Sequence, residues 1–389
     1  MKNRRPGRRL GLLAVLVVLL LGGSGRAAVG DHQPGWQLLA DDVLWDRVDF
    51  RIVQEPDPLR YHVLRVHPGA PVRFKPVVSN GRLAFGRETV SSMCSRVGAI
   101  GCVNANFAIC PTCNTPHGAV VRKHQLLQSP TDHQYQLSIV DGRLQTGEIP
   151  WSARIEAVRS GAPDVLHIDG VNSPLPRDGI VLRNRHYGAT TGSPEGTVEL
   201  VLRAPTPLWV GGVRQQVAPV RLVTDGNARI PAGGAVLSGR GMGAHVLWAW
   251  AWNNARVPMD LVVHSPRGME LAVSGHPTLL VAGERTALDP ADPKVYQLHP
   301  RTLVGWDDLG SVWFVVVDGR QPHSRGITLY EAQDLLLKLG ATHGMNMDGG
   351  GSSAITTSCE IGWCLRNRPS DGRERRVGVA LAVVPPERW

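Results

Sequence analysis

The sequence predicts an α+β protein in which β-rich mixed sheets make up most of the fold and a few helices lie between them. Short strand-like runs alternate with turns of Gly, Pro, Asn and Asp along most of the 389 residues. The 29 prolines limit long helices. Two segments still show helical periodicity, and the second belongs to a strand–helix–strand unit near the C-terminus.

Residues 1–28 have the pattern of an export signal, and residues 29–43 that of a linker. A basic start precedes the apolar run Leu10–Leu21, and small residues near Ala27 offer a cleavage site. The run is short for a membrane span, so an uncleaved anchor is the alternative and the one membrane contact that we expect. We therefore predict a secreted or cell-envelope protein with one domain over residues 44–386.

The net charge of +9 gives little support for a nucleic-acid partner. Six of the basic residues lie within residues 1–28, so the basic balance belongs mostly to the predicted signal. No basic stripe or aromatic–basic motif follows in the rest of the sequence. We expect no nucleic acid to bind.

Six cysteines occur, an even count that favours disulfides in an exported protein. Six cysteines allow 15 pairings. Their short separation favours a bond between Cys359 and Cys364. Cys110 and Cys113 have the spacing of a zinc knuckle or a redox pair, but no second pair of matching spacing accompanies them. The remaining two cysteines are Cys94 and Cys102.

Strands and one helix are predicted along the first two thirds of the sequence. Representative strands cover Tyr61–Val66, Thr197–Leu202 and Met259–Val263. The helix covers Glu88–Gly98, where the apolar residues fall on one face.

A better-marked helix is predicted over Thr328–Leu339. Thr328 and Glu331 have capping-box spacing, in which each side chain bonds to a free amide of the first turn. Apolar runs that read as buried strands flank the helix, at Val312–Val317 and at about Thr342–Met347. If these strands run parallel, their C-terminal ends share one sheet edge, where ligands commonly bind.

Two carboxylates follow these strands. Asp318 follows the first strand, and Asp348 follows the second and precedes Gly349–Gly351. Three consecutive glycines carry an entropic cost, so we expect a sharp bend or a close approach. Their amides could form an anion nest, to which Ser352 and Ser353 add hydroxyl donors. No phosphate loop, Gly-x-Ser-x-Gly elbow or His-Glu-x-x-His helix occurs in the sequence.

Several segments together resemble the phosphodiester glycosidase family. These segments are Asn346–Ser353, Arg301–Gly305, Asp318–Leu339, Asn104–Phe107 and Pro369–Asp371. The resemblance is strongest over residues 296–384 and continues more weakly back to about residue 44. Two departures alter small residues of the family pattern, at Asn104–Asn106 and at Ser274–Pro277.

The resemblance implies hydrolysis of a sugar 1-phosphodiester at the glycosidic C1–O bond, in cell-envelope or extracellular glycans. Cleavage there builds positive charge on the sugar ring, which a carboxylate stabilises, and the phosphate that leaves needs charge stabilisation. We assign Asp348 as the leading catalytic carboxylate and Asp318 as the second. The residues expected to bind substrate are Arg301, Thr302, Arg320, Asn104, Asn106, Asn346, Gly349, Gly350, Gly351, Ser352, Ser353 and Arg368.

Two other interpretations remain open. A non-catalytic module could bind cell-envelope polysaccharide through Trp248, Trp250 and Trp252, which would share one face of a strand. A structural calcium ion could bind at Asp348, although one acidic side chain is few for calcium. We expect no cofactor and no catalytic metal, and a sugar phosphate or polysaccharide as the partner.

Overall fold

The structure, a computed structural model, describes residues 37–389 except 85, 110–114, 132–134, 159–160 and 205–206. The predicted signal, Cys110 and Cys113 lie outside the described residues. The predicted linker ends earlier than expected, because strand β1 (Gln37–Trp45) begins within it. Pairing with β2 (Val48–Glu55) supplies the backbone hydrogen bonds that order this segment.

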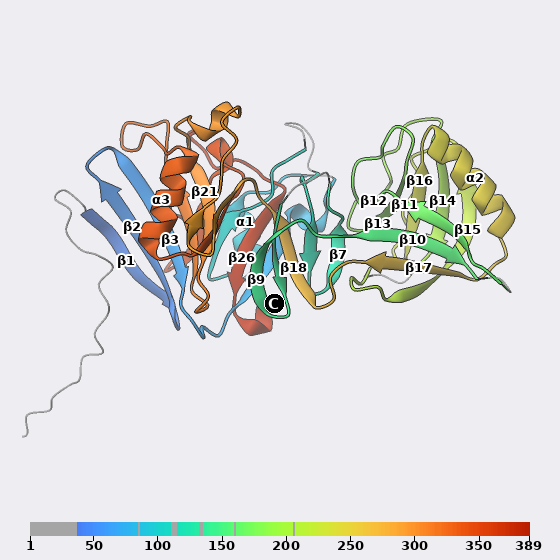
Figure 1. The fold of residues 1–389 in the computed structure, drawn as a ribbon, viewed down its shortest axis with the longest axis horizontal. Helices are drawn as coiled ribbons and strands as arrows, with labels where there is room; N and C mark the ends of the chain where they lie inside the picture. Colours follow the sequence, from blue (N-terminus) through green and yellow to red (C-terminus); the bar gives the residue numbers. More distant parts are fainter. Residues whose placement is uncertain (1–36, 85, 110–114, 132–134, 159–160, 205–206) are drawn as a thin grey trace, which may run out of the picture. The chain divides into compact units, whose positions relative to one another are not determined.

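The α+β prediction is confirmed, since the described residues form four β-sheets and three α-helices (Figure 1). The helices are α1 (Val90–Val97), α2 (Met242–Asn254) and α3 (Leu329–Leu339). Short 3-10 turns are η1 (Ser79–Gly81), η2 (Pro293–Val295), η3 (Gly350–Ser352) and η4 (Pro386–Arg388). No helix in this part of the chain is long and apolar enough to cross a membrane.

Two sheets have eight strands each. The first has the order β1, β2, β3 (Leu59–Val66), β22 (Val312–Val317), β21 (Arg301–Trp306), β23 (His343–Asn346), β19 (Thr278–Val281) and β20 (Glu284–Arg285). The second has the order β11 (Asp164–Ile168), β10 (Ser152–Ala157), β17 (Met259–His264), β15 (Arg214–Val223), β14 (Val198–Arg203), β16 (Gly234–Gly239), β13 (Ile180–Asn184) and β12 (Gly170–Val171).

The other two sheets have five strands each. One has the order β7 (Gln125–Gln128), β6 (Val120–Arg122), β18 (Met269–Ser274), β8 (Gln136–Val140) and β9 (Arg143–Gly147). The other has the order β25 (Gly362–Leu365), β24 (Ile355–Cys359), β5 (Gly101–Asn104), β26 (Val379–Val384) and β4 (Arg73–Val78).

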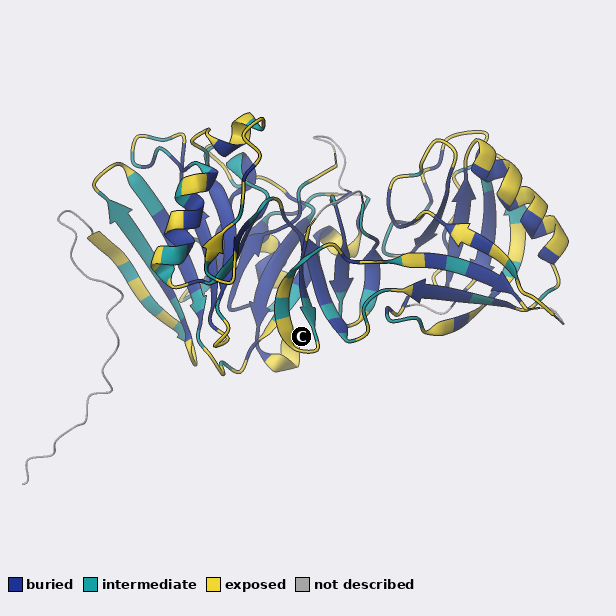
Figure 2. Cartoon of the chain, in the orientation of Figure 1, coloured by how far each residue is buried: buried dark blue, intermediate teal, exposed yellow. Residues whose placement is uncertain are grey.

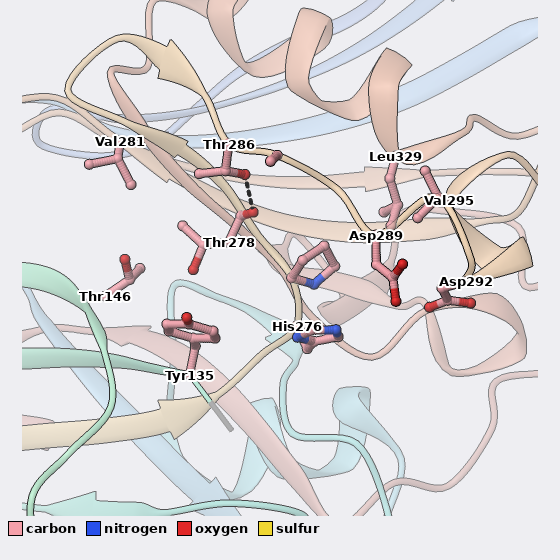
Figure 3. Close-up of a pocket in the computed structure, with 12 residues that line it drawn as sticks. Tyr135, Thr146, His276, Thr278, Val281, Thr286, Asp289, Asp292, Val295 and Leu329 are labelled. Carbon is pink, nitrogen blue, oxygen red and sulfur yellow. Dashed lines mark hydrogen bonds between the residues drawn. The ribbon is translucent and has the colours of Figure 1, made fainter. Parts of the chain in front are cut away.

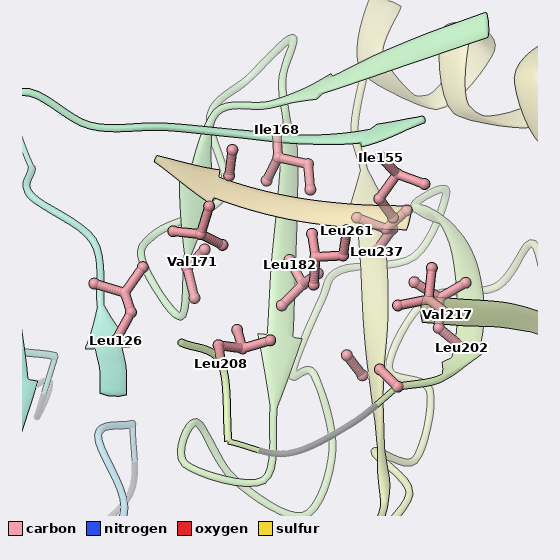
Figure 4. Packing of buried hydrophobic residues seen from close by; sticks show 14 of the residues in the cluster. Leu126, Ile155, Ile168, Val171, Leu182, Leu202, Leu208, Val217, Leu237 and Leu261 are labelled. Carbon is pink, nitrogen blue, oxygen red and sulfur yellow. The ribbon is translucent and has the colours of Figure 1, made fainter. Parts of the chain in front are cut away.

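The second sheet encloses its own apolar core. Residues such as Leu182, Leu202, Leu237 and Leu261 fill it, and they come from β13, β14, β16 and β17 (Figure 4). Figure 2 shows the buried faces of these strands in dark blue. α2 packs on β14 and β16 and adds Leu247 to the same core.

The prediction of a strand through Trp248, Trp250 and Trp252 is wrong, because these residues lie in α2. Alternating Trp and Ala imitate a period of two. The buried positions, however, are Leu247, Trp250, Ala251 and Asn254, and that spacing belongs to a helix face.

The cap of α3 forms as predicted. Thr328 Oγ1 accepts from the Glu331 amide at 3.1 Å, and a Glu331 carboxylate oxygen accepts from the Thr328 amide at 2.8 Å. Gly340, with φ of 95°, ends the helix in the left-handed region that favours glycine. Leu335 and Leu336 pack into a core shared with β21 and β22.

The condition that β22 and β23 run parallel is met. Both pair antiparallel with β21, which lies between them, so they run parallel to each other. Neighbouring strands lie about 4.8 Å apart, so the two strands that precede Asp318 and Asp348 are separated by about 10 Å.

The predicted Cys359–Cys364 disulfide is present, at the turn between β24 and β25. A second disulfide joins Cys94 on α1 to Cys102 on β5. The first bond closes the β24–β25 hairpin, and the second cross-links α1 to β5.

Candidate active site

Asp348 lies directly after β23, and Gly349–Gly351 form the turn that follows it. Gly350 has φ of 61°, which glycine adopts without strain. A Cβ atom on Gly351 would overlap the ion pair between Arg375 and Asp371, and one on Gly349 would lie 3.0 Å from the Pro300 carbonyl oxygen. Both a bend and close approaches therefore require these glycines.

The amides of this turn are mostly used within the protein. The Gly350 amide donates to the Pro300 carbonyl at 2.8 Å, and those of Ser352 and Ser353 donate to Gly349 and Gly350. These amides therefore donate to backbone carbonyls of the protein and are not free to form the anion nest that the sequence predicted. Side chains have to supply most of the contacts to an anion.

Asn104 holds the turn in place. Its Nδ2 donates to the Asp348 carbonyl at 2.6 Å. Its Oδ1 accepts from Thr302 Oγ1 at 2.8 Å and from the Ala354 amide at 3.1 Å. Asn104 and Thr302 are both fully buried. The structure therefore places these two predicted binding residues behind Asp348, where they position its backbone.

The Asp348 side chain faces a small cavity of about 20 Å³. Burial raises the pKa of Asp348 to about 6, although the Ser352 hydroxyl, the Arg375 charge and the Gly349 amide act in the opposite direction. A carboxyl group with such a pKa can exchange a proton near neutral pH. The cavity is also lined by Arg87, Asn106, Phe107, Ala108, Pro116, Ser352, Arg376, Val377 and Gly378.

Asn106 presents a buried acceptor at this cavity. Its Nδ2 lies within hydrogen-bond distance of the His117 and Ala119 carbonyls and of Ser274 Oγ, at 2.9–3.1 Å, which fixes the orientation of the amide. Its Oδ1 is buried and has no partner among the described residues. A buried acceptor without a partner costs about 1–3 kcal/mol, so this atom suits a donor from substrate or water.

Asp318 is enclosed. His62 Nε2 and His323 Nε2 lie 3.2 and 3.1 Å from the same carboxylate oxygen, and the Arg368 amide donates to the other at 3.0 Å. Burial would raise the pKa of Asp318, but the hydrogen bonds from His62, His323 and the Arg368 amide hold it below its usual range. The carboxylate accepts, so each histidine must carry its proton on Nε2.

The predicted arginines divide into two kinds. Arg301 is buried and donates to the carbonyls of Lys294, Gln297 and Ile327, and burial lowers its pKa to about 10. Arg320 extends over Gly350 and lies 3.0 Å from His299 Nδ1. Arg320 is therefore placed to meet an anion beside the turn.

The remaining predicted residues lie around the turn. Arg368 is exposed and contributes its backbone to Asp318. Asn346 donates to the His276 carbonyl at 2.6 Å. Its Oδ1 and the Ser353 Oγ are buried and have no partner in the part of the chain that the structure describes.

A larger cavity of about 400 Å³ lies beyond Asn346 (Figure 3). Asn346 connects it to the turn, because its side chain holds the backbone of His276, which lines the cavity. Tyr135, Asp289 and Asp292 also line it. Aromatic rings, carboxylates and hydroxyl groups are side chains that suit a sugar-sized ligand.

Sequence reasoning did not select several residues that the structure brings to the site. Lone residues outside a motif carry no signal of their own, although His62, His276 and His323 lie in segments that the sequence had marked. The residues are His62, Arg87, Tyr135, His276, Asp289, Asp292, His323, Arg375 and Arg376. Within the described residues, no group of three or more His, Cys, Asp or Glu could hold a metal ion.

Comparisons with known proteins identify several similar sequences. Residues 210–384 match the family model described as phosphodiester glycosidase. The chain is 38% identical over 89 residues to YomE, an uncharacterized SPbeta prophage-derived protein of Bacillus subtilis. It is 36% identical over 96 residues to N-acetylglucosamine-1-phosphodiester alpha-N-acetylglucosaminidase of Bos taurus. Each match covers 23% of this chain, but only 13% and 17% of the two relatives.

Solved structures share the fold over most of the chain. A hypothetical protein from Synechocystis has a TM-score of 0.66 at 19% identity, covering 86% of this chain and 61% of that one. A "Putative exported protein" of Burkholderia pseudomallei K96243 has a TM-score of 0.63 at 22% identity, covering 84% and 74%. Residues 210–384, which include Asp318, Asp348 and the glycine-rich turn, are therefore similar in sequence to the phosphodiester glycosidase family.

Proposed function

We propose that this protein is an exported hydrolase that cleaves a sugar 1-phosphodiester at the C1–O bond, in cell-envelope or extracellular glycans. The observation that carries the proposal is the position of Asp348, which has a raised pKa and faces a cavity lined by arginines. The two disulfides and the match of residues 210–384 to the phosphodiester glycosidase model support it.

The chemistry divides between Asp348 and the basic side chains near it. As positive charge builds on the sugar ring, the Asp348 carboxylate stabilises it, attacks C1 or activates a water molecule. Arg87, Arg376 and Arg320 supply positive charge to the phosphate that leaves. Asn106 Oδ1 accepts a hydrogen bond from the sugar or from the water.

Asp318 has an indirect role in this scheme. Its carboxylate is enclosed by His62, His323 and the Arg368 amide, so it orients neighbours and does not contact substrate. No step requires a metal ion or cofactor, and a structural calcium ion at Asp348 remains to be tested with a chelator.

The test is a panel of sugar 1-phosphodiesters that differ in the sugar, with released sugar measured. We expect hydrolysis by the wild-type chain and none above background by Asp348→Asn. Asp334→Asn, an exposed change on α3, is the matched control and should keep full activity. Saturable glycan binding without turnover across the panel would instead support the binding-module interpretation.

A further inference from the structure

α2 buries one side and exposes a large apolar surface on the other. Leu247, Trp250 and Ala251 pack into the core of the second sheet. Figure 2 shows the outward side of this helix in yellow, which marks exposed residues. The large apolar side chains exposed there are Met242 (63%), Val246 (48%), Trp248 (46%) and Trp252 (72%).

The outward side has no charge of its own. None of the 13 residues of α2 is Asp, Glu, Lys or Arg. A helix on the surface of a soluble protein normally carries charged residues on its outer face, and a helix that is apolar all round is normally covered. Contiguous exposed apolar surface of this kind marks an interaction site.

The two exposed tryptophans suit a lipid interface. The Trp248 and Trp252 rings stack on each other, with centroids 5.7 Å apart and planes 13° apart. Tryptophan is enriched where hydrocarbon meets lipid headgroups, because the ring is apolar and its N–H is polar. A sugar site would need several hydrogen-bonding side chains beside the rings. His245 and Asn253 are the exposed polar residues of α2, whereas Met242, Val246 and Ala249 are apolar.

Exposed arginines lie at both ends of the helix. Arg240 precedes α2 and Arg256 follows it. Arg177 lies against the N-terminal end, where its carbonyl oxygen would be 2.6 Å from a Cβ on Gly241. Two carboxylates lie at the same ends, where Asp178 accepts from the Met242 amide and Asp164 from Asn254 Nδ2, so the three arginines outnumber them. The basic fringe complements anionic headgroups.

We propose that the outward face of α2 docks this protein on an anionic lipid surface, with the helix lying in the plane of the interface. A helix of 13 residues is about 20 Å long, too short to span a bilayer, and one of its sides is already buried in the protein, so it would lie flat in the interface. No residue of the candidate active site lies on α2, so docking and hydrolysis are separable.

The test is sedimentation of the full chain with phosphatidylcholine vesicles, with or without about a third phosphatidylglycerol. We expect the wild type to bind the anionic vesicles, and Trp248→Ser/Trp252→Ser to lose at least tenfold in affinity. Trp45→Ala, which removes a 42% exposed tryptophan from β1, is the matched control and should bind as the wild type does. Arg240→Gln/Arg256→Gln should reduce the preference for phosphatidylglycerol.

Every variant keeps residues 1–36, so a difference between variants reports on α2. Quenching of tryptophan fluorescence by brominated lipid should be weaker in the double serine variant than in Trp45→Ala. Equal sedimentation of the wild type and the double serine variant would overturn the proposal. So would a dimer in solution that this variant dissociates without any vesicle binding, because a second copy would then cover the face.

Discussion

Asp318 and Asp348 follow parallel strands of one sheet, yet their surroundings differ in almost every respect. Three protein donors surround Asp318 and keep its pKa low. Asp348 is partly exposed at a cavity, and burial raises its pKa. Environments that move two carboxyl pKa values apart commonly separate two roles. The comparison supports the proposed division, in which Asp348 takes part in the reaction and Asp318 positions neighbouring groups.

The largest expected effect tests the role of Asp348. Asp348→Asn keeps the shape of the side chain but removes the charge and the proton exchange, so we expect kcat to fall about 10²–10⁴-fold. Hydrolysis rates of the folded variant are the measurement. An unchanged kcat would show that Asp348 takes no part in the reaction, and the proposed difference in role between Asp348 and Asp318 would then be wrong.

A loss of stability is expected at Asp318. Asp318→Ala removes the acceptor of His62 and His323 from a buried site, so the free energy of unfolding should fall by about 1–3 kcal/mol. Denaturant titration measures it, with Asp334→Ala as the exposed control. A variant that is as stable as the wild type, but inactive, would instead place Asp318 in the reaction.

The two carboxylates should also respond oppositely to pH. Because the folded state raises the pKa of Asp348, its ionisation opposes folding, and stability should fall by up to about 3 kcal/mol as pH rises from about 4 to 6. The stability of Asp348→Asn relative to the wild type should therefore increase over that pH range. The lowered pKa of Asp318 means that its stabilisation is present above about pH 4 and is lost on acidification. Unfolding free energies of the three proteins between pH 3 and 7 test both slopes.

The smallest expected effect concerns the turn beside Asp348. Gly350→Ala places a side chain at φ of 61°, which costs about 1–2 kcal/mol. We expect a modest loss of stability and a larger loss of kcat, because the turn carries Asp348. A loss of stability with unchanged kcat would show that the turn tolerates movement. Thermal denaturation and the hydrolysis assay together separate these results.

Local patterns predicted the elements that carry the site. The capping box of α3 and the apolar runs of β22 and β23 depend on residues close in sequence, so they could be recognised there. The roles of Asn104 and Arg301 could not be recognised. They depend on hydrogen bonds to distant or backbone partners, such as the 198-residue separation between Thr302 and Asn104.

α2 shows a second kind of limit. Both of its sides are apolar, so the contrast between faces that reveals a helix is missing from its sequence. The beginning of β1 was hidden for a similar reason, since its strand partner lies in the next segment and its own residues are half exposed.

The hydrogen bonds of Asn104 also indicate how much of the chain is needed to form the site around Asp348. One side chain of β5 connects the carbonyl of Asp348, the hydroxyl of Thr302 and the amide of Ala354. A fragment limited to residues 210–384 would contain every carboxylate and glycine of the turn but not this anchor. The glycine-rich turn therefore depends for its shape on β5, which lies in the N-terminal half of the chain.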